Sequence, residues 1–285
     1  MWTQSRLRAR LAEIGIRPSR GLGQNFLVDG NFVQYLLREA RLAPGDQVLE
    51  IGPGPGVLTP GIAQAAGWVL AVELDPRMAA LCREELGAAA NAEVLVADIL
   101  AGKNLLNPEV RERLERASAS GPIRVISNLP YSAATPAMLN LLESGLPMGE
   151  CLVTVQKEIA ERWCARPGGK KYGAVSVQLQ LLTEPKLLRT APPEVFWPAP
   201  HVQSAVVRLV PRSGGKPDEA YFRTAAWVRA GFGHRRKALA RSLAKCAELG
   251  VDDAEVTRRL AALGRRADVR AEELAPGEWT VLAGA

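Results

Sequence analysis

The chain has 285 residues, 47% of them hydrophobic and 23% charged, which is typical of a globular protein whose core needs no disulfides. The net charge of +6 suggests a polyanionic partner. The N-terminus lacks the apolar region of a signal peptide, no run reaches membrane-spanning length, and the four cysteines form no C-x-x-C pair. We therefore expect a cytoplasmic protein with no membrane contact and no metal site.

The first twenty residues are rich in arginine and contain one acid, Glu13. Residues 5–14 have the apolar spacing of a helix, so this stretch fits either a solvated helix or an arm that contacts phosphates. A glycine-containing loop, Gly21 to Leu27, follows, and a second helix is predicted to begin near Asp29 or Asn31, which are both good N-caps.

From Pro44 onward, apolar strands alternate with helices. The predicted strands are 47–51, 68–73, 93–97, 123–127 and 151–155, and the predicted helices are 76–86, 108–117 and 135–142. This alternation predicts an α/β fold, a doubly wound parallel sheet with both faces covered. Residues 175–182 fit a helix or a strand, and we expect 202–210 to form an antiparallel edge strand.

Pro211 to Pro217 is the one clear linker by composition. Beyond it the pattern predicts helices and no strand, at 220–232, 236–249, 253–263 and 278–282. We therefore predict two domains, 1–211 and a small all-helical domain, 217–285.

The glycine loop Glu50-Ile51-Gly52-Pro53-Gly54-Pro55-Gly56-Val57 follows the first strand of this series. Its glycines let the backbone approach a ligand closely. Val57 occupies the position where a dinucleotide-binding loop needs a small residue, and the two prolines remove amides that would bind a pyrophosphate. The loop therefore favours a ligand without phosphates, such as S-adenosylmethionine.

Two acids end the next two predicted strands. Glu73 is placed to bind both hydroxyls of a ribose, and Asp98 to meet an adenine amino group. Carboxylates at strand ends also serve as helix N-caps, but two of them after a glycine loop favour a cofactor site.

Asn128-Leu129-Pro130-Tyr131 follows the strand at 123–127, at the sheet edge where ligands bind. The amide oxygen of Asn128 and a carbonyl, most simply that of Leu129, could accept the hydrogens of an exocyclic amine on a base. Tyr131 could stack on a base that has been lifted from its helix. The alternative is a turn that closes a strand, with Tyr131 as a half-buried plug.

The tail carries a basic cluster, formed by Arg235, Arg236, Lys237, Arg241 and Lys245. Their spacing places much of the charge on one helical face, which is either solvated or bound to phosphate. Near it lies His234; for this residue and for His201 we favour a structural or RNA-contact role over acid–base chemistry.

Taken together, these motifs resemble those of the small-subunit ribosomal RNA adenine dimethyltransferase family, of the KsgA/Dim type, over about 21–209. The blocks that carry the resemblance are Gln24 to Leu27, Val48 to Thr59, Val72 to Asp75, Asn128 to Tyr131, Thr154 to Glu158, Lys171 to Val177, Phe196 to Val207 and, in the tail, Gly231 to Lys237. Ser132 to Ala134 is less polar than the family's usual run, and the tail after Leu249 matches poorly.

The resemblance implies a Rossmann-like class I methyltransferase that dimethylates two adjacent adenosines near the 3′ end of 16S rRNA. The cofactor contacts that it implies are Asn25, Leu27, Gly52, Gly54, Glu73, Asp98 and Asn128. The implied catalytic residues are Asn128, Leu129 and Tyr131, with Phe196 as the second aromatic face. From the charge of the basic cluster we expect Arg235, Arg236, Lys237 and Arg241 to contact RNA. We expect a monomer that acts on rRNA in an immature small ribosomal subunit.

Two alternatives stay open from the sequence. One is an N6-adenine methyltransferase that acts on large-subunit rRNA or DNA. The other is a ribosome-assembly factor for which methyl transfer is secondary. A nicotinamide dehydrogenase is disfavoured by Val57.

Overall fold

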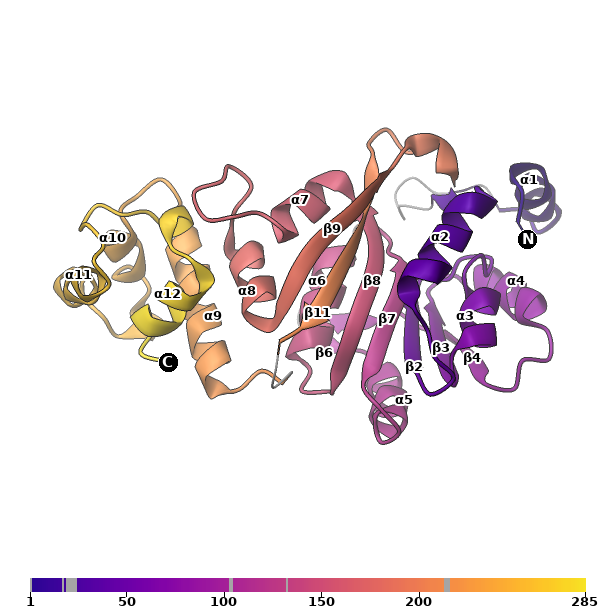
Figure 1. Ribbon diagram of the computed structural model, residues 1–285, viewed down its shortest axis with the longest axis horizontal. Coiled ribbons are helices and arrows are strands. Elements are labelled where there is room, and N and C mark those ends of the chain that lie inside the picture. The colour runs from indigo at the N-terminus through magenta and orange to yellow at the C-terminus, as the bar shows by residue number, and fades with distance from the viewer. Residues whose placement is uncertain (1, 17, 19–24, 103–104, 132, 213–215) are drawn as a thin grey trace. The chain divides into compact units, whose positions relative to one another are not determined.

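The computed structural model describes residues 2–16, 18, 25–102, 105–131, 133–212 and 216–285 (Figure 1). The arginines at 17 and 20, the loop at 21–24, Ser132 and linker residues 213–215 lie outside this set. Contacts divide the chain into two units, Met1–Ala160 with Lys186–Pro211, and Glu161–Pro185 with Arg212–Ala285. The second unit thus includes a segment that precedes the linker, while the division into domains at 211 and 217 stays a prediction.

A seven-stranded sheet has the order β4-β3-β2-β7-β8-β11-β9. Its strands are β2 (Gln47–Ile51), β3 (Trp68–Glu73), β4 (Ala92–Val96), β7 (Ile123–Asn128), β8 (Met148–Gln156), β9 (Thr183–Ala191) and β11 (Ser204–Pro211). The five strands from β4 to β8 are parallel, which confirms the predicted α/β sheet. β11 is antiparallel to β8 as expected, but it is not the edge strand, because β9, which the sequence did not predict, lies outside it.

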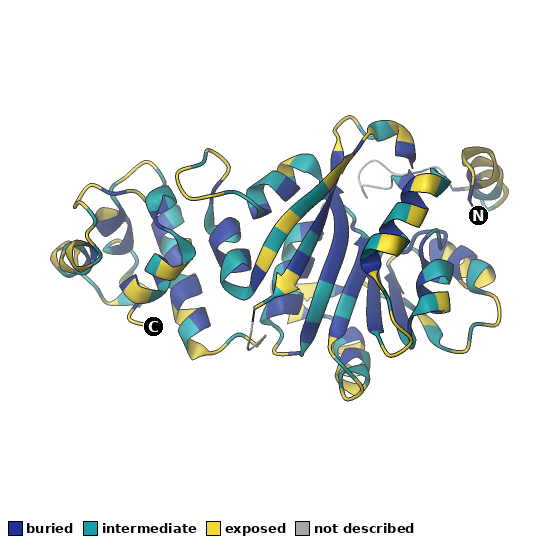
Figure 2. Cartoon of the chain, in the orientation of Figure 1, coloured by how far each residue is buried: buried dark blue, intermediate teal, exposed yellow. Residues whose placement is uncertain are grey.

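Helices cover both faces of the sheet. They are α2 (Gly30–Ala40), α3 (Thr59–Ala65), α4 (Pro76–Leu86), α5 (Pro108–Ser118) and α6 (Ala134–Glu143), and α7 (Lys157–Trp163) directly follows β8. α2 begins at its predicted cap, where Asp29 accepts from the Phe32 amide at 2.7 Å. α2 and α3 lie in front of the sheet and α6 behind it (Figure 1). The central strands are buried along most of their length, as their near-continuous apolar sequence predicts (Figure 2).

One helix and two short strand pairs complete the first unit. α1 (Gln4–Glu13) is the predicted N-terminal helix. β1 (Phe26–Leu27) pairs with β10 (Phe196–Trp197), which joins two of the family blocks, and β5 (Leu100–Gly102) pairs with β6 (Leu105–Leu106). Pairs this short carry no periodic signal in the sequence.

The second unit is helical. It contains α8 (Ala174–Leu182), α9 (Glu219–Phe232), α10 (Leu239–Leu243), α11 (Asp253–Ala262), α12 (Pro276–Leu282) and the 3-10 turns η2 (Ala247–Leu249) and η3 (Ala271–Glu273). Tyr172, Trp227 and Trp279 lie in its core. Among the helices that the structure describes, none is long and apolar enough to cross a membrane.

The helix predicted over 236–249 is wrong in its extent. Residues 233–237 form a turn in which the Lys237 amide donates to the His234 carbonyl at 2.8 Å, and α10 begins only at Leu239. The Leu239 amide donates to the Val269 carbonyl at 2.8 Å, so a tertiary contact sets this helix start. The basic residues before it therefore lie on a turn and not on a helical face.

Candidate active site

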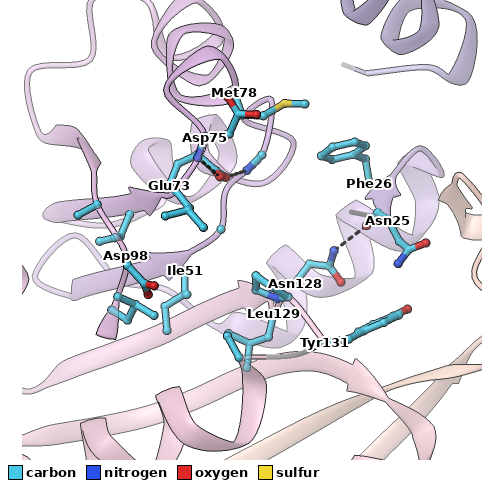
Figure 3. A pocket seen from close by; sticks show the side chains of 18 of the residues that line it. Asn25, Phe26, Ile51, Glu73, Asp75, Met78, Asp98, Asn128, Leu129 and Tyr131 are labelled. Carbon is cyan, nitrogen blue, oxygen red and sulfur yellow. Dashed lines mark hydrogen bonds between the residues drawn. The ribbon is translucent and has the colours of Figure 1, made fainter. Parts of the chain in front are cut away.

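A cavity of about 490 Å³ lies at the carboxyl ends of β2, β3, β4 and β7 (Figure 3). This is the edge at which open α/β sheets bind ligands. The predicted site residues that line it are Asn25, Gly52, Gly54, Glu73, Asp98, Asn128, Leu129 and Tyr131. The structure therefore brings together segments that are far apart in the chain.

The glycine loop is fitted to its neighbours at two positions. Gly52 has φ +66°, and a Cβ there would lie 2.9 Å from Cγ of Pro130. Gly54 has φ +58°, and its Cβ would lie 3.0 Å from the Phe26 ring. Both positions need glycine, because the backbone is left-handed and a neighbouring motif packs directly against it.

Glu73 fastens this loop to the next strand. One carboxylate oxygen accepts from the Gly54 amide at 2.9 Å, and the other accepts from the Asp75 amide at 3.0 Å (Figure 3). Burial raises the pKa of Glu73, and the bonds from backbone amides oppose that shift. A carboxylate has about four acceptor positions, so these two bonds leave room for a ligand hydroxyl.

Asp75 was missed as a cavity residue by the sequence analysis. It is the N-cap of α4 and accepts from the Arg77 amide at 2.9 Å, and hydrogen bonding by the Arg77 side chain lowers its pKa. Asp75-Pro76 is a common helix start, so the sequence did carry a signal for it.

Asp98 lies two residues beyond the observed end of β4 and lines the cavity. One of its oxygens accepts from the Leu100 amide at 2.9 Å, which fixes the carboxylate beside the turn. It caps no helix, so the alternative explanation that we gave for this acid does not apply.

Asn128 is held in one orientation and keeps one buried acceptor. Its Nδ2 donates to the Asn25 carbonyl at 3.1 Å, as Figure 3 shows. Its Oδ1 is buried and has no hydrogen-bond partner among the residues described. A buried acceptor without a partner is costly, and at a cavity wall it indicates a ligand that donates a hydrogen bond.

Leu129 and Tyr131 are fixed by contacts with β8 and β11, respectively. The Leu129 amide donates to the Thr154 carbonyl of β8 at 3.0 Å. The Tyr131 hydroxyl lies 2.8 Å from Oγ of Ser204, a fully buried residue at the start of β11. Burial raises the pKa of Tyr131, so its hydroxyl stays protonated. Ser204 was not predicted, since nothing local marks it as a partner of the tyrosine.

Two predicted site residues do not line the cavity. Leu27 is buried in the core, and Phe196, with 3% of its surface exposed, lies opposite it in the β1–β10 pair. The Phe196 ring packs edge-on against Phe32, with centroids 6.4 Å apart. The expected second aromatic face is therefore part of the core in this structure.

Beneath the glycine loop lies a buried acid, Glu50. It is 2% exposed, and burial raises its pKa to about 8, so the carboxyl is largely neutral at pH 7. The neighbouring Cys82 thiol, whose Sγ lies 3.4 Å from Oγ1 of Thr59, has its pKa raised to about 12, again chiefly by burial.

The predicted RNA contacts lie in the second unit and differ from one another. Arg235 is used internally: it pairs with Glu272 at 3.6 Å and donates to the Lys170 carbonyl at 3.0 Å. Arg236, Lys237 and Arg241 are exposed and form no ion pair with any described residue. The nearby Lys245 ammonium lowers the pKa of Lys237, which indicates a local excess of positive charge. We call Arg236, Lys237, Arg241 and Lys245 the basic ridge.

A glycine loop tied to an acid on the next strand, with Asn128 to Tyr131 across the cavity of a mainly parallel sheet, defines a Rossmann-like class I methyltransferase. The ribosomal RNA adenine dimethylase family model matches residues 17–275, and the chain belongs to that family.

Similar proteins agree with this assignment. Ribosomal RNA small subunit methyltransferase A of Moorella thermoacetica is 37% identical over 282 residues, 97% of this chain and 95% of that protein. The protein of the same name from Alkaliphilus oremlandii is 36% identical over 269 residues, 93% of this chain and 90% of that one. Among solved structures, the 23S rRNA methyltransferase ErmE is 25% identical with a TM-score of 0.67, covering 91% of this chain and 98% of its own. A dimethyladenosine transferase from Plasmodium falciparum is 20% identical with a TM-score of 0.71 over 90% of this chain and 95% of its own, which supports the fold.

Proposed function

We propose that this enzyme uses S-adenosylmethionine to dimethylate N6 of two adjacent adenosines near the 3′ end of small-subunit rRNA, during ribosome biogenesis. The observation that carries the proposal is the buried, unpartnered Oδ1 of Asn128 at the cavity wall, beside the Leu129 carbonyl and the Tyr131 ring. An aromatic amine offers the two hydrogens that such a pair of acceptors can bind.

The cavity residues fit S-adenosylmethionine. Gly52 and Gly54 line the cavity with backbone that carries no side chain, Glu73 can accept from ribose hydroxyls, and Asp98 can accept from an adenine amino group. When bound, this cofactor supplies an electrophilic methyl group. Asn25 and Asn128, already bonded to each other, line the same cavity and would both contact the cofactor.

The chain's own contribution to the reaction is position and polarity. Acceptance of both N6 hydrogens favours a more tetrahedral nitrogen, whose lone pair is then available for attack. Stacking on Tyr131 holds the base out of its helix. The dipoles of Asn128 and the Leu129 carbonyl stabilise the cationic nitrogen as it forms, and this acidic ammonium loses its proton to water. The amine retains one hydrogen after the first transfer, which permits a second.

Recognition of the RNA belongs to the basic ridge in this proposal. Its four cations are exposed and have no acidic partner among the described residues, so they are available to phosphates. Arg235 supports the ridge indirectly, since it ties the turn to Glu272 and to the Lys170 carbonyl. We expect the enzyme to act as a monomer in the cytoplasm.

The test is transfer of labelled methyl from S-adenosylmethionine to small ribosomal subunits that lack the modification, with large subunits and DNA in parallel. Label in the small subunit alone, digesting to N6,N6-dimethyladenosine, is the expected result. Label in large-subunit RNA or DNA would support the proposed methyl transfer but contradict the proposed small-subunit substrate. Binding of cofactor and subunit without any label would instead favour an assembly factor.

A further inference from the structure

One face of the N-terminal helix α1 is buried against the rest of the first unit, so α1 is not a fully solvated helix. Leu7 and Leu11 are 0% and 1% exposed and form one buried cluster with Phe26 and Met78. Phe26 and Met78 also line the cavity, so the apolar face of α1 packs directly behind two of its walls.

A second contact joins the N-terminus to the glycine loop. Nε1 of Trp2 donates to the Pro55 carbonyl at 3.1 Å, and the indole is 3% exposed. Pro55 lies between Gly54 and Gly56, which both have positive φ. The indole therefore restrains the glycine loop next to Gly54, a cavity residue, at a point where flanking glycines would otherwise leave the backbone free to move.

Charged contacts attach the polar side of α1 to the C-terminal end of α4 and to β10. Arg6 pairs with Glu85, and Arg10 pairs with Glu84, both on α4, whose first turn lines the cavity. The Arg8 guanidinium lies 5.2 Å from the ring centroid of Trp197, the residue opposite Phe26 in the β1–β10 pair. Three arginines of the expected arm are thus engaged within the first unit.

We propose that α1 and Trp2 form a brace for the cofactor cavity, in which Trp2 is a positioning residue that acts through the glycine loop. This inference rests on the proposed function, because it assigns an effect on cofactor binding. A brace and a phosphate-contacting arm make different predictions. Loss of a brace raises the dissociation constant of the cofactor, whereas loss of an arm raises the KM for RNA and changes its salt dependence.

The first experiment compares Trp2→Phe with wild type and with Trp68→Phe, a control at the amino end of β3. Phenylalanine keeps an aromatic ring but removes the indole donor. We expect the Kd for S-adenosylmethionine, measured without RNA by calorimetry, to rise about fivefold for Trp2→Phe, as for loss of one buried hydrogen bond. The kcat at saturating cofactor and the KM for RNA should stay near wild type, and Trp68→Phe should leave the Kd unchanged.

The second experiment exchanges the charges of one ion pair, with Arg6→Glu, Glu85→Arg and the double variant. Exposed pairs contribute little, so each single variant should raise the cofactor Kd only about two- to threefold. The double variant should restore the part due to the ion pair, but not the part due to the Arg6 guanidinium over the Trp2 ring, 4.4 Å from its centroid. A phosphate arm predicts that Arg6→Glu raises the KM for RNA and that Glu85→Arg does not restore it.

An unchanged cofactor Kd in both Trp2→Phe and the Arg6 series would overturn the brace. If wild type itself binds no S-adenosylmethionine, the proposed function fails instead, so the two failures are distinguishable. The melting temperature of each variant, measured without cofactor, shows whether the compared proteins are equally folded.

Discussion

At the scale of single residues, Asn128 is the side chain on which the proposed chemistry depends most. Asn128→Ala should lower kcat for methyl transfer by about 100-fold or more, which is typical for loss of one preorganised dipole in an active site. Cofactor affinity should fall far less, because the glycine loop and Glu73 are untouched. Single-turnover rates and the cofactor Kd check this, and loss of binding with a normal rate per bound cofactor would contradict it.

Ser204 should matter through Tyr131 alone. Ser204→Ala and Tyr131→Phe each remove the 2.8 Å contact between the hydroxyls, and each should lower kcat/KM for RNA about fivefold. The double variant should lose no more than either single variant, since both remove the same bond. Ser204→Thr, which keeps the hydroxyl, serves as the matched control, and additive losses in the double variant would argue against the pairing.

Glu50 should make stability depend on pH. Its pKa is about 8 in the folded protein against an ordinary value of 4.5, so between these values the folded state retains a proton that the unfolded chain has released. The free energy of unfolding should therefore fall as pH rises through this window, by up to about 1.4 kcal/mol per pH unit. The contribution of Glu50 to the free energy of unfolding is therefore fully present below pH 4.5 and lost above about pH 8.

Glu50→Gln tests this dependence by urea denaturation near both ends of the window. The variant should show a shallower fall, and Glu73, whose pKa is also raised by burial, should contribute the slope that remains. Glu109→Gln, an exposed acid on α5, is the control and should leave the slope unchanged. A slope identical to wild type in Glu50→Gln would show that this carboxyl is ionised in the fold.

At the scale of elements, the turn before α10 carries basic residues with different roles. Arg236 and Lys237 are exposed to solvent, whereas Arg235 pairs with Glu272 and supports the fold. Arg236→Ala, Lys237→Ala and Arg241→Ala should each weaken binding to rRNA and lower the slope of log affinity against log salt by about one. Arg235→Ala should instead lower the melting temperature, because Glu272 loses its partner. Arg258→Ala, an exposed arginine on α11, is the matched control.

The sequence predicted the elements with strong periodicity and missed those set by tertiary contacts. β2, β3 and α4 begin and end at their predicted residues, and Asp29 is one of the two caps predicted for α2. The turn at 233–237 was not, because the amide of Leu239 bonds to a carbonyl thirty residues away in the chain. β9 was missed as well, since its sequence contains Pro185 and has neither a continuous apolar run nor a regular alternation of apolar and polar residues.

For the site, the motifs predicted which segments meet, but not how each side chain is oriented. Gly52, Glu73, Asp98, Asn128 and Tyr131 all reach the cavity, because they follow the strand ends that the pattern located. Phe196 was expected there and lies in the core, because pairing of β10 with β1 turns it toward Phe32. Such an outcome depends on a long-range strand pair, which a single sequence does not reveal.

At the scale of the whole molecule, a cut at the linker should not release an intact first domain. A fragment of residues 1–211 retains Tyr172 and Val177, which are fully buried with Trp227 and Trp279 in the intact chain. Uncovering this apolar surface should make the fragment aggregate or bind a hydrophobic dye. Addition of 212–285 in trans should restore solubility, whereas a stable, monomeric fragment 1–211 would contradict the assignment of 161–185 to the second unit.

The passage of the chain between its two units has a consequence for synthesis. Glu161–Pro185 belongs to the second unit, yet β11, which pairs with β8 in the sheet, is translated after it. A nascent chain that has emerged only to residue 185 holds a sheet without its last strands and a helical segment without its partners. Domains generally fold as units during translation, but here neither unit can finish before the other has begun. The growing polypeptide should therefore gain most of its stability late, and chaperones should be needed longest in the interval before β11 leaves the exit tunnel.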